Sequence, residues 1–181
     1  GITRDYELHN LQDAASAAGA WDDMYRANGN QQPYGSDESY VLPGVFLSGL
    51  HEVEDWGCGL GYAQRHLPHT KYIGIDGSPN SFVDRVADLR FYTTIADGIL
   101  LRHVLDHNWC WEQILQNALD SFRRQMCIVI WLPMSSAETL QVAVNSLGTP
   151  DLRIPADRLE SMLAGLWWRR EPACDADARR M

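Results

Sequence analysis

Three glycines and two acidic residues occupy positions where a parallel β-sheet would bind a ligand. Gly57, Gly59 and Gly61 follow Asp55 closely, and Asp76 ends the next β-rich run. Glycine lets the backbone approach a ligand because it has no Cβ, and open α/β sheets bind ligands at the carboxyl ends of their strands. An acid at the end of the second strand can accept hydrogen bonds from both hydroxyls of a ribose. The spacing therefore predicts a nucleoside-containing ligand between two strand ends.

The glycine spacing argues against a dinucleotide. Dinucleotide-binding loops follow the pattern G-x-G-x-x-G, and the third glycine would fall at position 62, which is Tyr62. A dinucleotide also presents its pyrophosphate to a helix N-terminus. Asp55 suits a ligand that carries an ammonium group instead, because a carboxylate at the strand end can accept from it directly or through water.

Two histidines four residues apart, His103 and His107, stand near the end of a later apolar run. Histidine exchanges a proton near neutral pH, so either is a candidate general base toward a hydroxyl acceptor. The alternative is that His103 fills space beside the ligand and that His107 packs. Asp106 adds a third donor, but two histidines without further ligand spacing are seldom a metal site, and we expect no metal. Arg102 either orients an anionic substrate or is solvated.

The composition sets limits on the function. The chain has 181 residues and a net charge of −9, which suits one domain and argues against nucleic acid as a partner, since nucleic-acid binders usually carry a basic patch. The first residues lack the layout of a signal peptide, and no apolar run has the length of a membrane span. None of the four cysteines forms a CxxC pair, and we expect reduced cysteines in a cytoplasmic protein without a membrane partner.

The elements that would position these residues alternate along the chain. Hydrophobic periodicity predicts strands ending near 55 and at 71–76, 85–89, 98–103, 126–132 and 167–171, and helices at 62–67, 82–83, 111–125 and 157–166. The run 98–103 is apolar almost throughout, as in a strand buried on both faces. This order predicts an α/β protein with a doubly wound, mostly parallel, Rossmann-like sheet and helices on both faces. The segment 140–144 fits a helix or a strand.

Three regions follow from this pattern. Residues 1–44 are expected to form an N-terminal helix and lid segment, with the helix over 8–27 and a loop over 28–44. Residues 45–171 form the predicted ligand-binding core, and 172–181 a flexible tail. We expect a single strand, 167–171, after the last helix. Whether a last antiparallel strand is also present in the sheet stays open.

Four segments in order resemble the motifs of class I S-adenosylmethionine-dependent methyltransferases. They are DWGCGLG at 55–61, YIGIDGS at 72–78, VADL at 86–89 and DGILLRHVLDH at 97–107. The resemblance covers 45–132 in detail and 157–171 loosely, and WDDMY at 21–25 resembles the lid of small methyltransferases. It implies that S-adenosylmethionine is the cofactor and that His103 and His107 are the candidate catalytic residues. The implied cofactor-binding residues are Asp55, Gly57, Cys58, Gly59, Gly61, Asp76, Gly77, Asp88, Leu89 and His103.

The resemblance implies methyl transfer to a small-molecule acceptor, such as a sugar or a natural-product intermediate. Whether the acceptor atom is oxygen, nitrogen or carbon stays open. The alternative is a non-catalytic S-adenosylmethionine-binding or interaction domain, because an open sheet edge needs a cover, and a homodimer is one such cover. A nicotinamide-dependent oxidoreductase is the third hypothesis, and Tyr62 argues against it.

Overall fold

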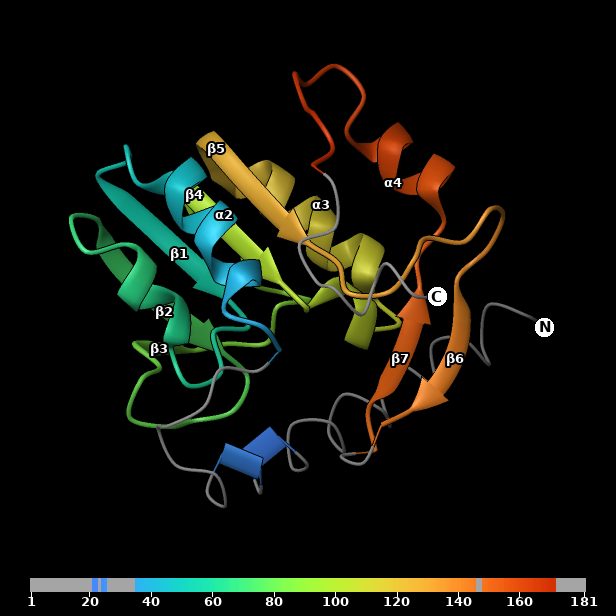
Figure 1. Ribbon diagram of the computed structural model, residues 1–181, viewed down its shortest axis with the longest axis horizontal. Coiled ribbons are helices and arrows are strands. Elements are labelled where there is room, and N and C mark those ends of the chain that lie inside the picture. The colour runs from blue at the N-terminus through green and yellow to red at the C-terminus, as the bar shows by residue number, and fades with distance from the viewer. Residues whose placement is uncertain (1–20, 23, 26–34, 146–147, 172–181) are drawn as a thin grey trace.

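Five parallel strands form the central sheet, in the order β3-β2-β1-β4-β5 (Figure 1). The strands are β1 (Glu52–Trp56), β2 (Lys71–Asp76), β3 (Arg85–Val86), β4 (Ala96–Arg102) and β5 (Phe122–Val129). The computed structural model describes residues 21–22, 24–25, 35–145 and 148–171. Every neighbouring pair in this sheet is parallel, which confirms the prediction of a doubly wound α/β fold.

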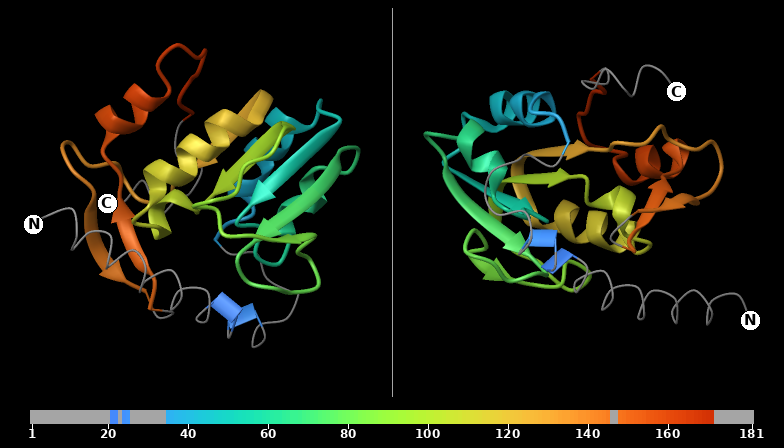
Figure 2. Two further views of the ribbon diagram at one scale, coloured as in Figure 1. Left: turned by 180° about the vertical axis from the view of Figure 1, so that it is seen from behind. Right: turned by 60° about the horizontal axis from the view of Figure 1, so that its bottom comes forward.

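Helices cover both faces of the sheet. Helix α2 (Glu38–Leu47) and the 3-10 helix η2 (Tyr62–His66) lie on one face, and α3 (Trp111–Ser121) lies on the other, as the front and back views show (Figures 1 and 2). Successive residues of β4 point to opposite faces. Leu100 packs in the core under α2, while Ile99 and Leu101 pack in the core under α3, which also holds residues of α4 (Ala156–Met162). Burial of β4 on both faces follows its apolar sequence.

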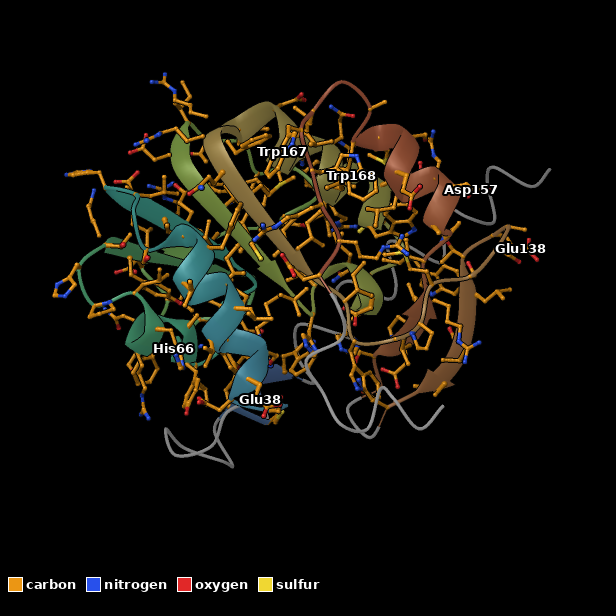
Figure 3. The ribbon with its side chains drawn as sticks, turned by 45° about the horizontal axis from the view of Figure 1, so that its top comes forward. Glu38, His66, Glu138, Asp157, Trp167 and Trp168 are labelled. Atoms are coloured by element: carbon orange, nitrogen blue, oxygen red, sulfur yellow. The ribbon has the colours of Figure 1, made fainter. Side chains whose placement is uncertain are left out.

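Helix α2 replaces part of the predicted loop 28–44. Pro43 and Gly44 suggested a loop, yet both lie inside the helix. Gly44 is needed there, because a Cβ would lie 2.7 Å from the Cβ of His66. Tyr40 stacks on the His66 ring at 5.9 Å between centroids, and Figure 3 shows His66 beside α2. Packing of α2 against η2 and the sheet therefore outweighs the poor helix propensity of its sequence.

Helix α3 ends four residues before its predicted end at 125, and β5 begins at Phe122 instead of 126. Two bonds explain the early end. The Ser121 hydroxyl donates to the carbonyl of Asn117 at 2.6 Å and accepts from the amide of Thr94 at 3.0 Å. Phe122 then pairs with Ala96 of β4, so pairing in the sheet sets the boundary.

A separate antiparallel hairpin follows the sheet. Strands β6 (Leu140–Val144) and β7 (Pro150–Arg153) pair with each other and lie to one side of the five-stranded sheet (Figure 1). The undecided segment 140–144 is thus a strand. Within the described residues, no antiparallel strand joins the edge at β5.

The predicted strand at 167–171 is wrong. These residues have no regular structure and are exposed, with Trp167 83% exposed, and Figure 3 shows Trp167 and Trp168 on the segment after α4. The segment pairs with no strand among the described residues, so its β-rich sequence stays irregular.

Other predicted elements are shorter or shifted. The strand predicted at 85–89 is limited to Arg85–Val86, and 82–83 lie in a turn instead of a helix. The strand predicted at 98–103 runs from Ala96 to Arg102, and the helix predicted at 157–166 ends at Met162. Most of the predicted helix 8–27 and the tail 172–181 lie outside the described residues. The boundaries of the three predicted regions stay predictions.

Among the described residues, none of the helices has the length and apolar character of a membrane span.

Candidate functional site

The glycine loop after β1 has left-handed backbone at each of its three glycines. The φ angles of Gly57, Gly59 and Gly61 are 77°, 54° and 66°, values that other residues adopt at a cost. The amide of Gly57 donates to the carbonyl of Ile75 at 2.7 Å, which ties the loop to β2. A Cβ on Gly57 would lie 2.5 Å from Val104 Cγ2. The loop therefore runs at the carboxyl ends of β1 and β2, where the sequence predicts a ligand.

Asp76, at the end of β2, holds the loop. One carboxylate oxygen accepts from the amide of Gly59 at 2.8 Å, and the other accepts from the amide of Ser78 at 2.9 Å. The side chain is buried, and burial raises the pKa of this carboxyl. A carboxylate offers about four lone-pair positions, so two bonds to the backbone leave acceptor capacity for the predicted ribose hydroxyls.

Asp55 is buried on the α2 side of the sheet. Its carboxylate accepts from the Tyr72 hydroxyl at 2.6 Å. Burial raises the pKa of Asp55 from 3.8 to about 6, while the Tyr72 hydrogen bond and the Arg102 charge lower it and Asp76 raises it. Tyr72 was missed by the sequence analysis. It pairs with Val53 and Asp55 pairs with Gly74, so the two side chains share one face, and strand alternation was the available signal.

Cys58 lies against the same strands. Its Sγ is 2.9 Å from the position that a Cβ on Gly74 would take, so Gly74 makes room for it. Cys58 is buried and free, and burial raises the pKa of its thiol. Cys110 and Cys127 also form no disulfide with a described residue. Gly77 is exposed, and a Cβ there would meet no atom closer than the Ala87 carbonyl at 3.8 Å, so packing alone does not require glycine at 77.

Asp88 and Leu89 follow β3 without joining the buried carboxylates. Asp88 is exposed, and Arg90 donates to it from Nε at 3.0 Å. This contact lowers the pKa of Asp88. Leu89 packs on the core beneath α3, and its carbonyl accepts from the Asn117 amide at 2.9 Å. Their role toward adenine stays a prediction.

Arg102 is buried at the end of β4 instead of solvated. Its guanidinium lies 3.6 Å from the centroid of the Tyr40 ring and donates to the Ser39 hydroxyl from Nε at 3.0 Å. A Cβ on Gly35 would lie 3.0 Å from this guanidinium. The sequence contained no local signal for these contacts, because α2 lies about 60 positions earlier in the chain.

The two histidines lie close together beyond β4. His103 has a φ of 54°, and its amide donates to the carbonyl of Val129 at 2.9 Å. Burial lowers the pKa of His103 from 6.5 to about 3, and the charges of Arg102 and His107 add to this. His107 lies in η3 (Leu105–His107), where its Nδ1 is 3.0 Å from the carbonyl oxygen of Pro150. The structure thus brings together the predicted pair and the hairpin β6–β7.

Part of the predicted lid covers the glycine loop. Trp21 and Tyr25 lie in a helical segment at the carboxyl ends of the strands (Figure 1), with their rings stacked at 5.9 Å between centroids. The Tyr25 hydroxyl is 2.9 Å from the position that a Cβ on Gly59 would take. Tyr25 therefore contacts the glycine loop.

No family model and no curated protein matches the sequence. A 1,6-didemethyltoxoflavin-N1-methyltransferase from Burkholderia thailandensis, solved with 1,6-didemethyltoxoflavin and S-adenosylhomocysteine, superimposes with a TM-score of 0.65 over 85% of this chain and 77% of its own, at 15% identity.

The chain has the class I methyltransferase fold. A second structure with this fold is the N-terminal domain of EvdMO1, solved in the presence of S-adenosylhomocysteine and D-fucose. It gives a TM-score of 0.52 over 77% of this chain and 80% of its own, at 14% identity. The methyltransferase fold confirms the architecture that the four motifs implied.

Proposed function

We propose that the protein is an S-adenosylmethionine-dependent methyltransferase that acts on a small-molecule acceptor. The observation that carries this proposal is the bond between the Gly59 amide and the Asp76 carboxylate, with buried Asp55 beside it. It joins the loop after β1 to the acid after β2, which is where α/β sheets bind nucleosides. Structures of the same fold with S-adenosylhomocysteine support the choice of cofactor.

The charges of this site fit the cofactor. Asp55 and Asp76 are both buried, and burial raises the pKa of each, although the Arg102 charge lowers that of Asp55. An ammonium group beside a carboxylate favours its ionised form, and Asp55 is the proposed partner for it. Asp76 would accept from the ribose hydroxyls. The residues proposed to line the cofactor are Gly57, Cys58, Gly59, Gly61, Gly77, Asp88, Leu89 and His103.

S-adenosylmethionine supplies a methyl group already activated by its sulfonium. The chain's own contribution is then chiefly to align the acceptor with that methyl, a proximity effect. His103 is a poor general base, because a pKa of about 3 leaves little affinity for a proton. His107 is the better candidate. Its Nδ1 faces the Pro150 carbonyl oxygen, which can only accept, so Nδ1 donates there and Nε2 is the nitrogen proposed as the base.

A small acceptor, such as a sugar or a natural-product intermediate, fits the acidic chain. The neighbours of the same fold were solved with 1,6-didemethyltoxoflavin and with D-fucose present, which supports a small molecule. The hairpin β6–β7 contacts η3 through Pro150, so we propose that it shapes the acceptor side of the site.

Calorimetry and a transfer assay test this function. We expect S-adenosylhomocysteine to bind with 1:1 stoichiometry and to raise the melting temperature, and NAD to do neither. A radiolabelled methyl-transfer assay over sugars, phenols, amines and heterocycles then identifies the acceptor. A protein stabilised by NAD and not by S-adenosylhomocysteine would refute the proposal.

One observation favours the alternative of a non-catalytic domain. Strand β5 is an edge of the sheet within the described residues, and unpaired edges invite pairing with another chain. Under this alternative the protein binds S-adenosylmethionine, docks on a partner or a second copy, and transfers no methyl group. Cofactor binding with no turnover across the acceptor panel, and a dimer by light scattering, would support it.

A further inference from the structure

We propose that His103, Asp106 and His107 bind a divalent transition-metal ion at the carboxyl end of β4. The structure brings one donor atom from each residue within 4.8 Å of the others. A tetrahedral ion with bonds of about 2.1 Å needs donors about 3.4 Å apart, so side-chain adjustments of about 1 Å complete the site. The sequence spacing alone argued against a metal, because it does not show that the turn through η3 brings the three side chains together.

His107 has the outer contacts of a metal ligand. Its Nδ1 lies 3.0 Å from the Pro150 carbonyl oxygen and 3.2 Å from Asp151 Oδ1. Metal-binding histidines almost always donate their other ring nitrogen to a carbonyl or a carboxylate, which fixes the tautomer and the ring orientation. Here the two acceptors come from β7, 43 and 44 positions along the chain from His107. Because Nδ1 donates to β7, Nε2 is the proposed ligand atom of His107.

Asp106 supplies an unsatisfied carboxylate oxygen. Its side chain is fully buried, at 0% exposure. Oδ2 accepts from the amide of Trp131 at 2.9 Å, whereas Oδ1 has no hydrogen-bond partner among the described residues. A buried carboxylate oxygen without a partner is costly, and a cation is the partner that would compensate it most strongly. This observation is independent of the histidine contacts.

The backbone of His103 is held in an unusual conformation. It is the one described residue other than glycine with a positive φ, at 54°. Such backbone persists when the surrounding structure imposes it, and it concentrates at functional sites. The bond from the His103 amide to Val129 of β5 holds this turn against the sheet. In this conformation a ring nitrogen of His103 lies within 4.8 Å of the donor atoms of Asp106 and His107.

The donor set selects the kind of metal. Two imidazoles and one carboxylate suit Zn²⁺, Fe²⁺ or related ions, whereas Mg²⁺ and Ca²⁺ prefer oxygen ligands. Three protein ligands also leave a coordination position open, as in catalytic zinc sites. We therefore choose Zn²⁺ as the probe.

The role that we propose for the metal in methyl transfer rests on the proposed function. A hydroxyl of the acceptor, bound at the open position, becomes more acidic. It loses its proton to water, its oxygen bonds to the methyl carbon, and the methyl–sulfur bond breaks with its electron pair on sulfur, which leaves S-adenosylhomocysteine. His107 then acts as a ligand instead of a base, and the acceptor class is a hydroxyl compound.

Zn²⁺ titration of the full chain tests the site after a chelator has been applied and removed. We expect 1:1 binding by calorimetry, and visible absorption of tetrahedral Co²⁺ on substitution. Asp106→Asn keeps an oxygen for the Trp131 amide, and His103→Asn places the residue that best tolerates positive φ after glycine. Each should weaken Zn²⁺ binding by at least about 10–100-fold, the loss that even outer-shell changes produce. His69→Asn, at an exposed turn, is the matched control and should bind like the wild type.

The outcomes separate this site from the proposed function. Absence of 1:1 Zn²⁺ binding in the wild type, or equal binding in Asp106→Asn and the wild type, would overturn the metal site. Melting curves confirm that each variant is folded. Binding of S-adenosylhomocysteine is measured separately in the chelated protein, so its failure would remove the proposed function while Zn²⁺ binding still stood.

Discussion

The amide of Gly59 donates to the Asp76 carboxylate at 2.8 Å across 17 positions of the chain. One side chain therefore both closes the glycine loop and offers the acceptor proposed for the cofactor ribose.

Asp76→Ala should weaken S-adenosylhomocysteine binding by about 1.5–3 kcal/mol, the worth of a hydrogen bond to a charged group. It should also lower the free energy of unfolding, because the amides of Gly59 and Ser78 lose their acceptor. Calorimetry and urea unfolding measure the two effects. Glu138→Ala, at an exposed acid on the segment before β6, is the control. Unchanged affinity in Asp76→Ala would remove Asp76 from the site.

Binding of S-adenosylhomocysteine should weaken as the pH falls through about 6. The ionised form of Asp55 is the proposed partner of the ammonium, and its pKa is raised to about 6, so affinity should drop by up to about tenfold per pH unit below that value. Asp55→Asn should bind more weakly at pH 7.5 and lose this dependence. Tyr72→Phe removes a bond that lowers the pKa of Asp55 and should move the midpoint to higher pH. Constant wild-type affinity from pH 7.5 to 5 would contradict the prediction.

The same pKa shift has a consequence for folding. The unfolded chain ionises Asp55 near 3.8, whereas the folded chain holds the proton up to about 6. Between these values the unfolded state binds fewer protons, so the contribution of Asp55 to stability falls as the pH rises. Asp55→Asn should therefore increase the free energy of unfolding at pH 7 relative to the wild type and have less effect at pH 4. Urea midpoints at both values test this, and an equal change at both would argue against it.

Gly57→Ala should destabilise the fold through two separate effects. The positive φ of 77° disfavours alanine by about 1–2 kcal/mol, and the new methyl group, 2.5 Å from Val104, adds about 1–3 kcal/mol of overpacking. Gly148 has a φ of 78°, and a Cβ there would meet no atom within 4 Å. Gly148→Ala therefore isolates the backbone effect. Adding Val104→Ala to Gly57→Ala should relieve the contact. Equal losses in the two single variants would show that the contact with Val104 is unimportant.

Glu54→Gln should lower the free energy of unfolding by about 1.5–3 kcal/mol. Glu54 is buried on the α3 side of the sheet and accepts from Trp56 Nε1 at 2.9 Å, the Tyr92 hydroxyl at 3.1 Å and the Thr94 hydroxyl at 3.2 Å. An amide nitrogen cannot accept from these donors. Glu52→Gln, on the same strand, removes a surface pair with Lys71 that is worth about 1 kcal/mol or less. Similar urea midpoints for both variants would contradict the prediction.

The sequence predicted where the candidate site residues lie along the strands, but it missed several of the hydrogen bonds that hold them. Asp55, Asp76 and the three glycines lie at the strand ends where the pattern put them, because glycine spacing and strand alternation are local properties. Tyr72, which bonds Asp55, and Asp151, beside His107, were missed because their partners lie on other elements of the fold. The same reason explains the wrong strand at 167–171, since a β-rich segment becomes a strand only when another strand pairs with it.

The sequence by itself determined the order of the five parallel strands along the chain, the place of the glycine loop and the acid at the end of each of the first two strands. Each depends on residues within one or two turns of the chain. Only the tertiary structure decided which donors meet at the end of β4, that α2 would form around Pro43, and that the hairpin β6–β7 would fix the ring of His107. Those outcomes depend on packing and hydrogen bonds between distant segments, whose free energies appear only when the chain folds.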